Sequence, residues 1–241
     1  MILENICFLV ADSARSKAYL QVLIKNDMIP AHCIVYCDNV QEMTSFAENY
    51  QESFSDKSSA FFNLNEPVLH SIQNANISYE IVNTKDINSE QMVQRIQKRV
   101  EKYMIYSGYG GTILKDQLFQ IGKKFLHIHA GILPQYRGST TAYYSYLMDK
   151  EIGATAIFLS EGIDEGEIIV QQKFEVCSGV NMDYVYEPWV RSQVLLKAIK
   201  CIVKNELKTY SQDDSLAETY YIIHPVLKHI AILSMERRIK D

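Results

Sequence analysis

Residues 127–141 read HIHAGILPQYRGSTT and directly follow the apolar residues at 125–126. The run KKFLHIHA (123–130) has the length and composition of a buried strand, which should end where a loop with proline and glycine begins. Side chains two residues apart on a strand point to the same side. We therefore expect His127 and His129 to face one site at the end of this strand.

On the N-terminal side of this strand, short apolar runs alternate with stretches of helical spacing. Strands are predicted at 6–12, 32–38, 78–85 and 102–111, and helices at 13–27, 88–103 and around 113–122. Ser13 is expected to cap the first helix. Asn88 and Gln91 resemble a capping box for the second, in which Met92, Ile96 and Val100 form the buried stripe. This order predicts an α/β protein with a mostly parallel twisted sheet and helices on both faces.

The C-terminal half shows a different order of elements. A helix is predicted over 141–153, two strands joined by a glycine-rich acidic turn over 154–176, and a long helix over 183–206. We expect one catalytic domain at 1–206 and a short C-terminal extension at 207–241 that could form a dimer contact. The segment 39–77 is irregular in sequence, and two interpretations of it remain open: a mobile excursion from the fold, or a helix with a loop.

Composition excludes several classes of protein. The 241 residues carry a formal net charge of −5, which does not favour a broad nucleic-acid surface. No apolar run approaches the roughly 20 residues that cross a bilayer, and the opening MILENICFLV lacks a basic leader. We expect a cytoplasmic protein with 5 reduced cysteines and with no nucleic-acid or membrane partner.

Three loops, at 107–112, 129–140 and 160–166, follow predicted strands, and ligands bind at such strand ends in open α/β sheets. Asp164 lies in the third loop between Gly162 and Gly166, which would permit a sharp turn. A carboxylate favours the charged form of a nearby histidine, and an imidazole N–H can stabilise an oxyanion. This chemistry suits acyl transfer to an amine. From these residues alone, a structural histidine pair and a metal site of His127, His129 and Asp164 remain open.

Residues 108–172, GYGGTILKDQ to EIIVQQ, resemble the core of the folate-dependent formyltransferases, which include methionyl-tRNA, glycinamide ribonucleotide and sugar N-formyltransferases. That family has the pattern Asn-x-His followed by Leu-Pro and glycine, and later Gly-(Leu/Val)-Asp-x-Gly. His129 falls on its catalytic histidine, Asp164 on its catalytic aspartate and Gly138 on its glycine. The resemblance implies a Rossmann-like formyltransferase fold.

The resemblance also implies a cosubstrate and a mechanism. N10-formyltetrahydrofolate would bind near 108–114 and 160–164, and the acceptor would bind near 136–138. His129, kept charged by Asp164, would stabilise the oxyanion and protonate the leaving folate nitrogen. The implied cosubstrate-binding residues are Gly108, Tyr109, Gly110, Ile113, Leu114, Gly162 and Ile163, and the implied substrate-binding residues are Tyr136, Arg137 and Gly138.

One departure from the family pattern concerns catalysis. His127 stands where the family has an asparagine that donates to the oxyanion, and an imidazole N–H can also donate. Loss of one such donor costs on the order of 10²–10³ in rate. His127 therefore either supplies the second donor or marks altered or lost catalysis.

The residues outside the core bear on the acceptor. About 35 residues follow the long predicted helix, fewer than the C-terminal barrel of the tRNA enzymes. The loop VADSARSK after the first strand lacks the glycines of the phosphate loop that the purine enzymes carry, although Ser13, Arg15, Ser16 and Lys17 could still hold a phosphate. We expect a small amine acceptor, foremost a nucleotide-linked amino sugar of glycan biosynthesis. The alternatives are a non-catalytic binding or scaffold relative, and a metal-dependent enzyme.

Overall fold

The computed structural model describes residues 1–41, 43 and 60–237. The described chain forms two compact units, one of residues up to 43 and 62–127, the other of residues 60–61 and 128–237. Of the segment 39–77, which the sequence left open, the structure describes residues 39–41, 43 and 60–77, and the rest lies outside the described residues. The predicted domain boundary after residue 206 stays a prediction.

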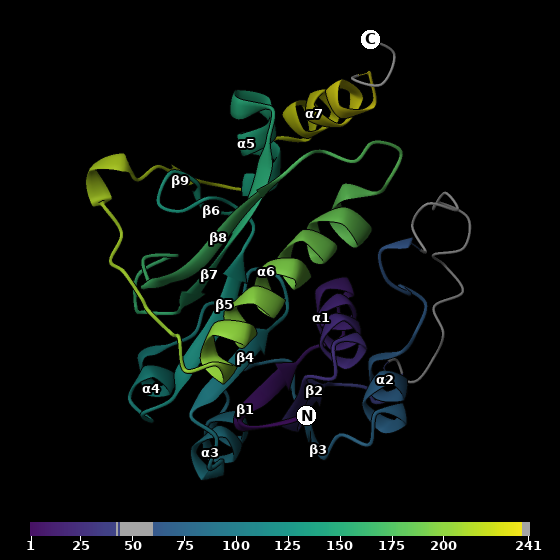
Figure 1. Cartoon of the computed structure of the whole chain (residues 1–241), viewed down its shortest axis with the longest axis vertical. Coiled ribbons are helices and arrows are strands. Elements are labelled where there is room, and N and C mark those ends of the chain that lie inside the picture. Colours follow the sequence, from purple (N-terminus) through teal and green to yellow (C-terminus); the bar gives the residue numbers. More distant parts are fainter. Residues whose placement is uncertain (42, 44–59, 238–241) are drawn as a thin grey trace. The chain divides into compact units, whose positions relative to one another are not determined.

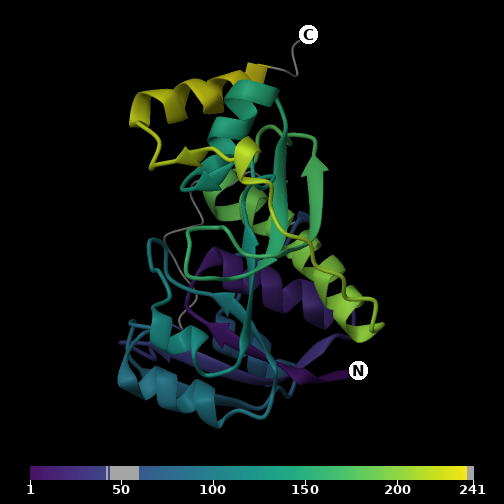
Figure 2. The same cartoon turned by 90° about the vertical axis from the view of Figure 1, so that its left-hand side faces the viewer.

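The first unit is a parallel sheet with helices on both of its faces. Its strands lie in the order β3-β2-β1-β4-β5, and each neighbouring pair is parallel. Figures 1 and 2 show α1 and α2 on one side of these strands and α3 and α4 on the other. The elements are β1 (Ile2–Val10), α1 (Ala14–Lys25), β2 (Ile29–Cys37), α2 (Val68–Asn74), β3 (Tyr79–Asn83), α3 (Glu90–Lys98), β4 (Tyr103–Ser107), α4 (Asp116–Phe119) and β5 (Lys124–His129). The predicted α/β class with a mostly parallel sheet is confirmed.

The start of α1 follows from its cap. Ser13 has an extended backbone, and its Oγ accepts a hydrogen bond from the amide of Ser16 at 3.1 Å, as predicted. The helix buries Tyr19, Leu20 and Leu23 among the core side chains of this unit. The cap thus sets where the helix begins, and its buried apolar side chains hold it against the core of the unit.

The predicted start of α3 was wrong by one residue. Ser89, not Asn88, is the N-cap, because its Oγ accepts from the amide of Met92. Met92 and Ile96 are buried as predicted, but Val100 is 86% exposed because the helix already ends at Lys98. The side chain of Asn88 instead bonds the backbone at Ile113 and Lys115, in the loop after β4.

The second unit contains an antiparallel strand pair and most of the C-terminal elements. Strand β7 pairs antiparallel with β8, and the short strand β6 pairs parallel with β9. Figures 1 and 2 both show α7 beside α5. The elements are β6 (Arg137–Gly138), α5 (Thr141–Asp149), β7 (Ile152–Phe158), β8 (Ile168–Phe174), a π-helical turn (Met182–Tyr186), α6 (Glu187–Val203), a 3-10 turn (Asp214–Leu216), β9 (Thr219–Tyr220) and α7 (Pro225–Arg237). The long helix predicted from 183 therefore begins with a π-helical turn, and the chain after it joins the second unit through β9.

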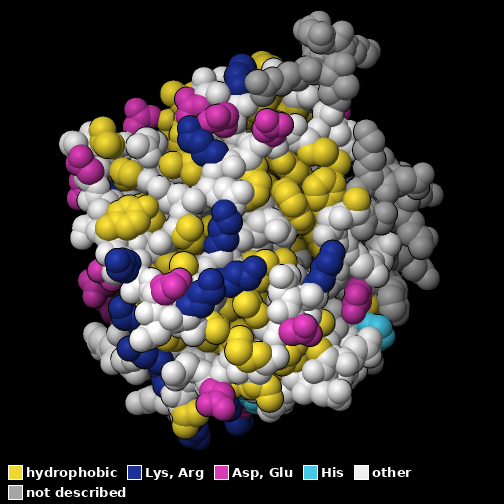
Figure 3. Space-filling view, in the orientation of Figure 1, with side chains coloured by type: hydrophobic (Ala, Val, Ile, Leu, Met, Phe, Trp, Pro, Cys, Tyr) yellow, Lys and Arg dark blue, Asp and Glu magenta, His cyan; other side chains and the backbone are white. Residues whose placement is uncertain are grey.

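The face of the molecule drawn in Figure 3 carries charged and apolar side chains together. Figure 3 shows Lys and Arg side chains interspersed with Asp and Glu, and apolar side chains between them. Within the described part of the chain, no helix combines the length and the apolar content required to cross a bilayer.

Candidate active site

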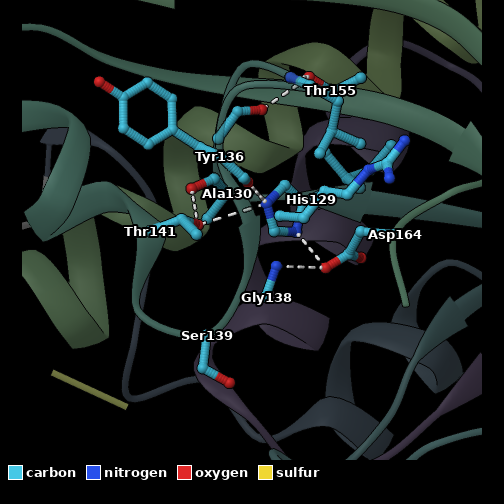
Figure 4. A network of polar contacts seen from close by, with 12 residues as sticks. His129, Ala130, Tyr136, Gly138, Ser139, Thr141, Thr155 and Asp164 are labelled. Atoms are coloured by element: carbon cyan, nitrogen blue, oxygen red, sulfur yellow. Dashed lines mark hydrogen bonds and ion pairs between the residues drawn. The ribbon is translucent and has the colours of Figure 1, made fainter. Parts of the chain in front are cut away.

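The last residue of β5, His129, is buried against Asp164 in the second unit. Only 3% of His129 is exposed, and its Nδ1 lies 3.3 Å from Asp164 Oδ2. Figure 4 shows both side chains with the backbone of Gly138 beside them. The strand thus delivers one member of the pair, and the loop between β7 and β8 delivers the other, as the sequence predicted for these two positions.

The loop places Asp164 in an uncommon backbone conformation. Asp164 has φ +56°, a left-handed conformation in which aspartate is tolerated better than most residues. Its Oδ2 accepts a hydrogen bond from the amide of Gly138 at 2.9 Å. Gly166 is required for a different reason, because a Cβ there would lie 1.7 Å from the carbonyl oxygen of Phe158. The sequence predicted a sharp turn that Gly162 and Gly166 would permit, but in the structure it is Asp164, between them, that has the left-handed backbone conformation.

The other ring nitrogen of His129 also faces oxygen. Its Nε2 lies 2.5 Å from the carbonyl oxygen of Tyr136 and 3.3 Å from Thr141 Oγ1. The Thr141 hydroxyl donates to the carbonyl of Ala130 at 2.5 Å, so it accepts from the histidine. Both ring nitrogens therefore face acceptors, and only the doubly protonated, positively charged imidazole supplies a donor at each.

The same contacts bear on the metal hypothesis. A histidine binds a metal through the lone pair of a deprotonated ring nitrogen. In this structure, Nδ1 of His129 faces Asp164 and Nε2 faces the Tyr136 carbonyl. His129 would have to give up one of these contacts to ligate an ion, so its surroundings favour a proton carrier over a ligand.

Tyr136, one of the predicted substrate residues, is buried beside the histidine. Its Oη donates to Asp149 Oδ2 at 2.6 Å, and its ring stacks on Tyr220 with centroids 5.5 Å apart. Burial, and then the hydrogen bond with Asp149, raises the pKa of the Tyr136 phenol. A cavity of about 270 Å³ adjoins it, lined by Ile132, Gln135, Tyr136, Ser145, Asp149, Glu151, Ile152, Gly153 and Lys173. The packing of Tyr136 thus positions the carbonyl that contacts His129.

Arg137, the second predicted substrate residue, is only 5% exposed. Its guanidinium donates to Gln212 Oε1 at 2.9 and 3.1 Å and to Asp214 Oδ1 at 2.7 Å. It therefore links the loop after β5 to the segment before β9. A role in binding the acceptor stays a prediction.

Gly138 cannot be replaced without strain. It has φ +98°, and a Cβ there would lie 2.0 Å from the carbonyl oxygen of Tyr220 in the neighbouring strand β9. Its amide is the group that donates to Asp164. The glycine that the sequence pattern singled out thus allows both the close approach of β9 and the hydrogen bond to the carboxylate.

Two predicted cosubstrate residues lie in the Asp164 loop. Ile163 is 53% exposed at the tip of the loop. A Cβ on Gly162 would lie 2.0 Å from Glu165 Oε2, the end of a flexible side chain that can move away. The loop thus presents an apolar side chain next to the half-buried Asp164.

The remaining predicted cosubstrate residues lie in the first unit, in the loop after β4. A Cβ on Gly108 would lie 2.2 Å from Tyr106 Oη, so the tyrosine side chain would have to shift, whereas no atom of the described residues lies within 4 Å of a Cβ on Gly110. Tyr109 Oη donates to the carbonyl of Tyr36 at 3.1 Å, and burial raises the pKa of the Tyr109 phenol to about 12. Further along the loop, Ile113 is 62% exposed and Leu114 is buried.

Two residues outside the predicted set hold this loop. Asn88 Nδ2 donates to the carbonyl of Ile113 at 2.9 Å, and Asn88 Oδ1 accepts from the amide of Lys115 at 2.8 Å. Arg15 Nη2 donates to the carbonyl of Gly108 at 2.5 Å. The two side chains thus fix opposite ends of the segment 108–115.

His127 is the last residue of the first unit and is half-buried. Its ring lies 6.1 Å from the ring of Tyr106, centroid to centroid. It precedes His129 by two residues in β5, the spacing on which the predicted common orientation of the two side chains rests. Its role as an oxyanion donor stays a prediction.

Sequence reasoning missed the residues that support the site. Thr141, Gln212 and Tyr220 contact His129, Arg137 and Tyr136 respectively. Their types, a threonine, a glutamine and a tyrosine in polar stretches, carried no signal of such a role. The contacts of Gln212 and Tyr220 with the loop after β5 form where the chain folds back and β9 pairs with β6.

Solved structures define the class of fold. Glycinamide ribonucleotide transformylase 1 from Symbiobacterium toebii aligns with a TM-score of 0.58 and 18% identity, over 86% of this chain and 93% of that one. An N-formyltransferase from Helicobacter canadensis, solved with folinic acid and dTDP-3-aminofucose, aligns with a TM-score of 0.55 and 16% identity, over 92% and 71%. The fold is therefore that of the formyltransferases.

The sequence comparisons identify the family. The formyl transferase family model matches residues 45–191, more than half of the chain. The chain belongs to this family. The methionyl-tRNA formyltransferase of Finegoldia magna is 28% identical over 112 residues, which cover 46% of this chain and 36% of that protein. The chain thus spans only about a third of the length of this relative.

Proposed function

We propose that this protein transfers a formyl group from N10-formyltetrahydrofolate to the primary amine of a small acceptor, foremost a nucleotide-linked amino sugar of glycan biosynthesis. The observation that carries the proposal is the contact of the buried His129 with the half-buried Asp164, with Nδ1 and Oδ2 3.3 Å apart, in a chain of the formyl transferase family. The folinic acid in the Helicobacter canadensis relative supports a folate cosubstrate.

The residues of the second unit account for the proton and charge steps. The donor, when bound, supplies the formyl carbon and the nitrogen that leaves. The charged imidazole of His129 stabilises negative charge on the formyl oxygen and returns a proton to that nitrogen. For this donation, the substrate must replace the Tyr136 carbonyl as the acceptor of the Nε2 proton. The proton lost by the attacking amine passes to Asp164 or to water.

Asp164 is suited to hold its charge beside the histidine. Its Oδ2 accepts from the Gly138 amide at 2.9 Å as well as facing His129. Hydrogen bonds to the ionised form stabilise a carboxylate. The carboxylate therefore keeps the imidazole oriented, while His127 supplies the second donor to the oxyanion in place of the family asparagine.

The nature of the acceptor is the finer part of the proposal. The Helicobacter canadensis N-formyltransferase was solved with dTDP-3-aminofucose, an amine on a nucleotide-linked sugar. The side chains after β1 do not offer a free phosphate cradle, because Arg15 bonds the Gly108 carbonyl and Lys17 Nζ bonds the carbonyl of Leu64 at 2.9 Å. This favours an amino sugar over a ribonucleotide bound at that helix start.

A direct assay tests this proposal. The protein is incubated with N10-formyltetrahydrofolate and, separately, with nucleotide-linked amino sugars, glycinamide ribonucleotide and methionyl-tRNA. Mass spectrometry follows the gain of one formyl group in place of one hydrogen. Formylation of an amino sugar is the expected result. Formylation of only the ribonucleotide or only the tRNA would reassign the acceptor, and no turnover with any would favour the binding or scaffold relative.

We also propose that two copies associate through the segment 221–233. Tyr221 and Ile222 are each 80% exposed, and Val226, Ile230 and Leu233 are 59%, 49% and 37% exposed. The three α7 residues recur at helical spacing and so share one face. The expected result is that the wild type sediments as a dimer and Ile230→Glu as a monomer. A monomeric wild type at assay concentrations would refute the association.

A further inference from the structure

Gln212 lies in the irregular segment between α6 and β9, and its side chain reaches the loop that carries Asp164. We propose that Gln212 is a positioning residue, which holds Asp164 in place for His129. The inference rests on the proposed function for its kinetic consequence. Its structural part concerns only the second unit and can be measured without turnover.

All hydrogen-bonding groups of the Gln212 amide are used. Its Nε2 donates to the carbonyl oxygens of Asp164 and Gly166, at 2.7 and 2.8 Å. Its Oε1 accepts from Nε and Nη2 of Arg137, at 3.1 and 2.9 Å. The chemistry of these neighbours fixes the orientation of the amide, because the nitrogen meets only acceptors and the oxygen only donors.

The contacts of Gln212 complete a ring around the carboxylate. Asp164 Oδ2 accepts from the Gly138 amide, and the neighbouring residue Arg137 donates to Gln212. Gln212 in turn donates to the backbone of Asp164. The aspartate is thus held through its side chain from one direction and through its backbone from the other.

The Asp164 loop requires such support. Asp164 adopts a left-handed backbone at φ +56°, which is less favourable for aspartate than for glycine. Ile163 before it is 53% exposed, and the side chain of Glu165 after it is 55% exposed and contacts the protein through Oε1, 3.7 Å from Arg137 Nη1. Strained residues persist where the surrounding structure over-determines them. The two bonds from Gln212 bind the loop backbone on both sides of Glu165.

The chain segment that carries Gln212 is itself anchored close by. Tyr210 exchanges two backbone hydrogen bonds with Ile168 at the start of β8, at 2.9 and 3.1 Å. Asp214 accepts a further bond from Arg137 at 2.7 Å. Gln212 is therefore held between two fixed points and acts as a rigid link between the loops.

Replacement by glutamate keeps the contact of residue 212 with Arg137 and removes its bonds to the Asp164 loop. Gln212→Glu keeps the length of the side chain and its contact with Arg137, but it sets a carboxylate oxygen against two carbonyl oxygens. Gln212→Met removes all four bonds without adding charge and serves if the glutamate variant does not fold. The matched control is Gln21→Glu, since Gln21 also bonds a loop backbone, through the carbonyl and amide of Asn63 at 2.8 and 2.7 Å.

Two measurements test the proposal. Because small displacements of catalytic groups can cost about 100-fold in rate, kcat should fall at least about tenfold in Gln212→Glu, while KM for the formyl donor changes less than about twofold. Amide exchange of Gly138, whose N–H is bonded to Asp164, should accelerate by about tenfold. Gln21→Glu should change neither quantity.

The outcomes separate this inference from the proposed function. If Gly138 exchange and kcat are both unchanged in Gln212→Glu, Gln212 does not position Asp164. If kcat falls equally in Gln212→Glu and Gln21→Glu, the effect is general destabilisation and the inference also fails. A wild type without formyl transfer would overturn the proposed function, whereas faster Gly138 exchange in the Gln212 variants would still support the link to Asp164.

Discussion

The amide of Gly138 donates a hydrogen bond of 2.9 Å to Asp164 Oδ2, the same oxygen that lies 3.3 Å from His129 Nδ1. A backbone group thus orients the carboxylate that pairs with the histidine. Because Gly138 has φ +98° and lies against β9, the strand pairing of the C-terminal segment is coupled to the geometry of the pair.

Gly138→Ala tests this coupling. The added Cβ would lie 2.0 Å from the Tyr220 carbonyl oxygen, so we expect a loss of about 2–3 kcal/mol in the free energy of unfolding. The hydrogen bond from the residue 138 amide to Asp164 should weaken as well. Chemical denaturation measures the loss. Gly122→Ala is the matched control, because Gly122 has φ +74° and no atom of the described residues lies within 4 Å of its Cβ position, so we expect the backbone strain of about 1 kcal/mol there. Equal losses in the two variants would contradict the close contact with β9.

His127→Asn restores the residue that the family pattern has at this position. If His127 serves as a substitute donor, the variant should retain or raise the rate of formyl transfer, because an amide N–H can donate to the same oxyanion. Steady-state kinetics measure kcat and KM. A correctly folded variant without activity would instead assign the imidazole of His127 a chemical role of its own.

The Arg99–Glu101 pair in the first unit predicts a pH dependence of stability. Burial opposes ionisation of Glu101, but the Arg99 guanidinium, with Nε 2.9 Å from Oε2, a backbone hydrogen bond and His32 together outweigh it, so the pKa of Glu101 is lowered. A carboxyl group with a lowered pKa stabilises the fold above its unfolded pKa of about 4.3, and this contribution disappears as the pH falls through its folded pKa.

Glu101→Gln should therefore reduce the free energy of unfolding by about 2 kcal/mol at pH 7, and the difference from the wild type should shrink below about pH 4. Urea unfolding at several pH values gives both quantities. Glu90→Gln, a change on the exposed side of α3, is the control and should have little effect. A difference that stays constant down to acid pH would refute the linkage.

Local sequence signals predicted most of the elements and named the two residues of the central pair as candidates. The cap at Ser13 and the strand that ends at His129 follow from short-range patterns, whereas Gly138 was singled out only by the resemblance to the formyltransferases, and the structure contains each of them. The alternation of the other helices and strands in the first unit followed in the same way, but α2 lies in the segment 39–77, for which the sequence left two interpretations open.

The supporting contacts could not be predicted, because they join residues far apart in the sequence. Gln212 bonds Asp164 across 48 residues, and Arg15 bonds Gly108 across 93. Even the local misplacement at α3 has this origin. Asn88 could have capped the helix, but its side chain bonds the backbone at Ile113 and Lys115, and Ser89 caps instead.

The most direct measurement compares His129→Ala with the wild type for both formyl transfer and folate binding. We predict that kcat falls by about 100-fold or more, since a positioned acid contributes 10²–10⁴, while the Kd for a folate analogue changes little. His70→Ala, a change on helix α2 of the first unit, should leave both at the wild-type value. Equal losses of turnover and folate affinity in His129→Ala, or unchanged turnover, would contradict the role of His129 in catalysis.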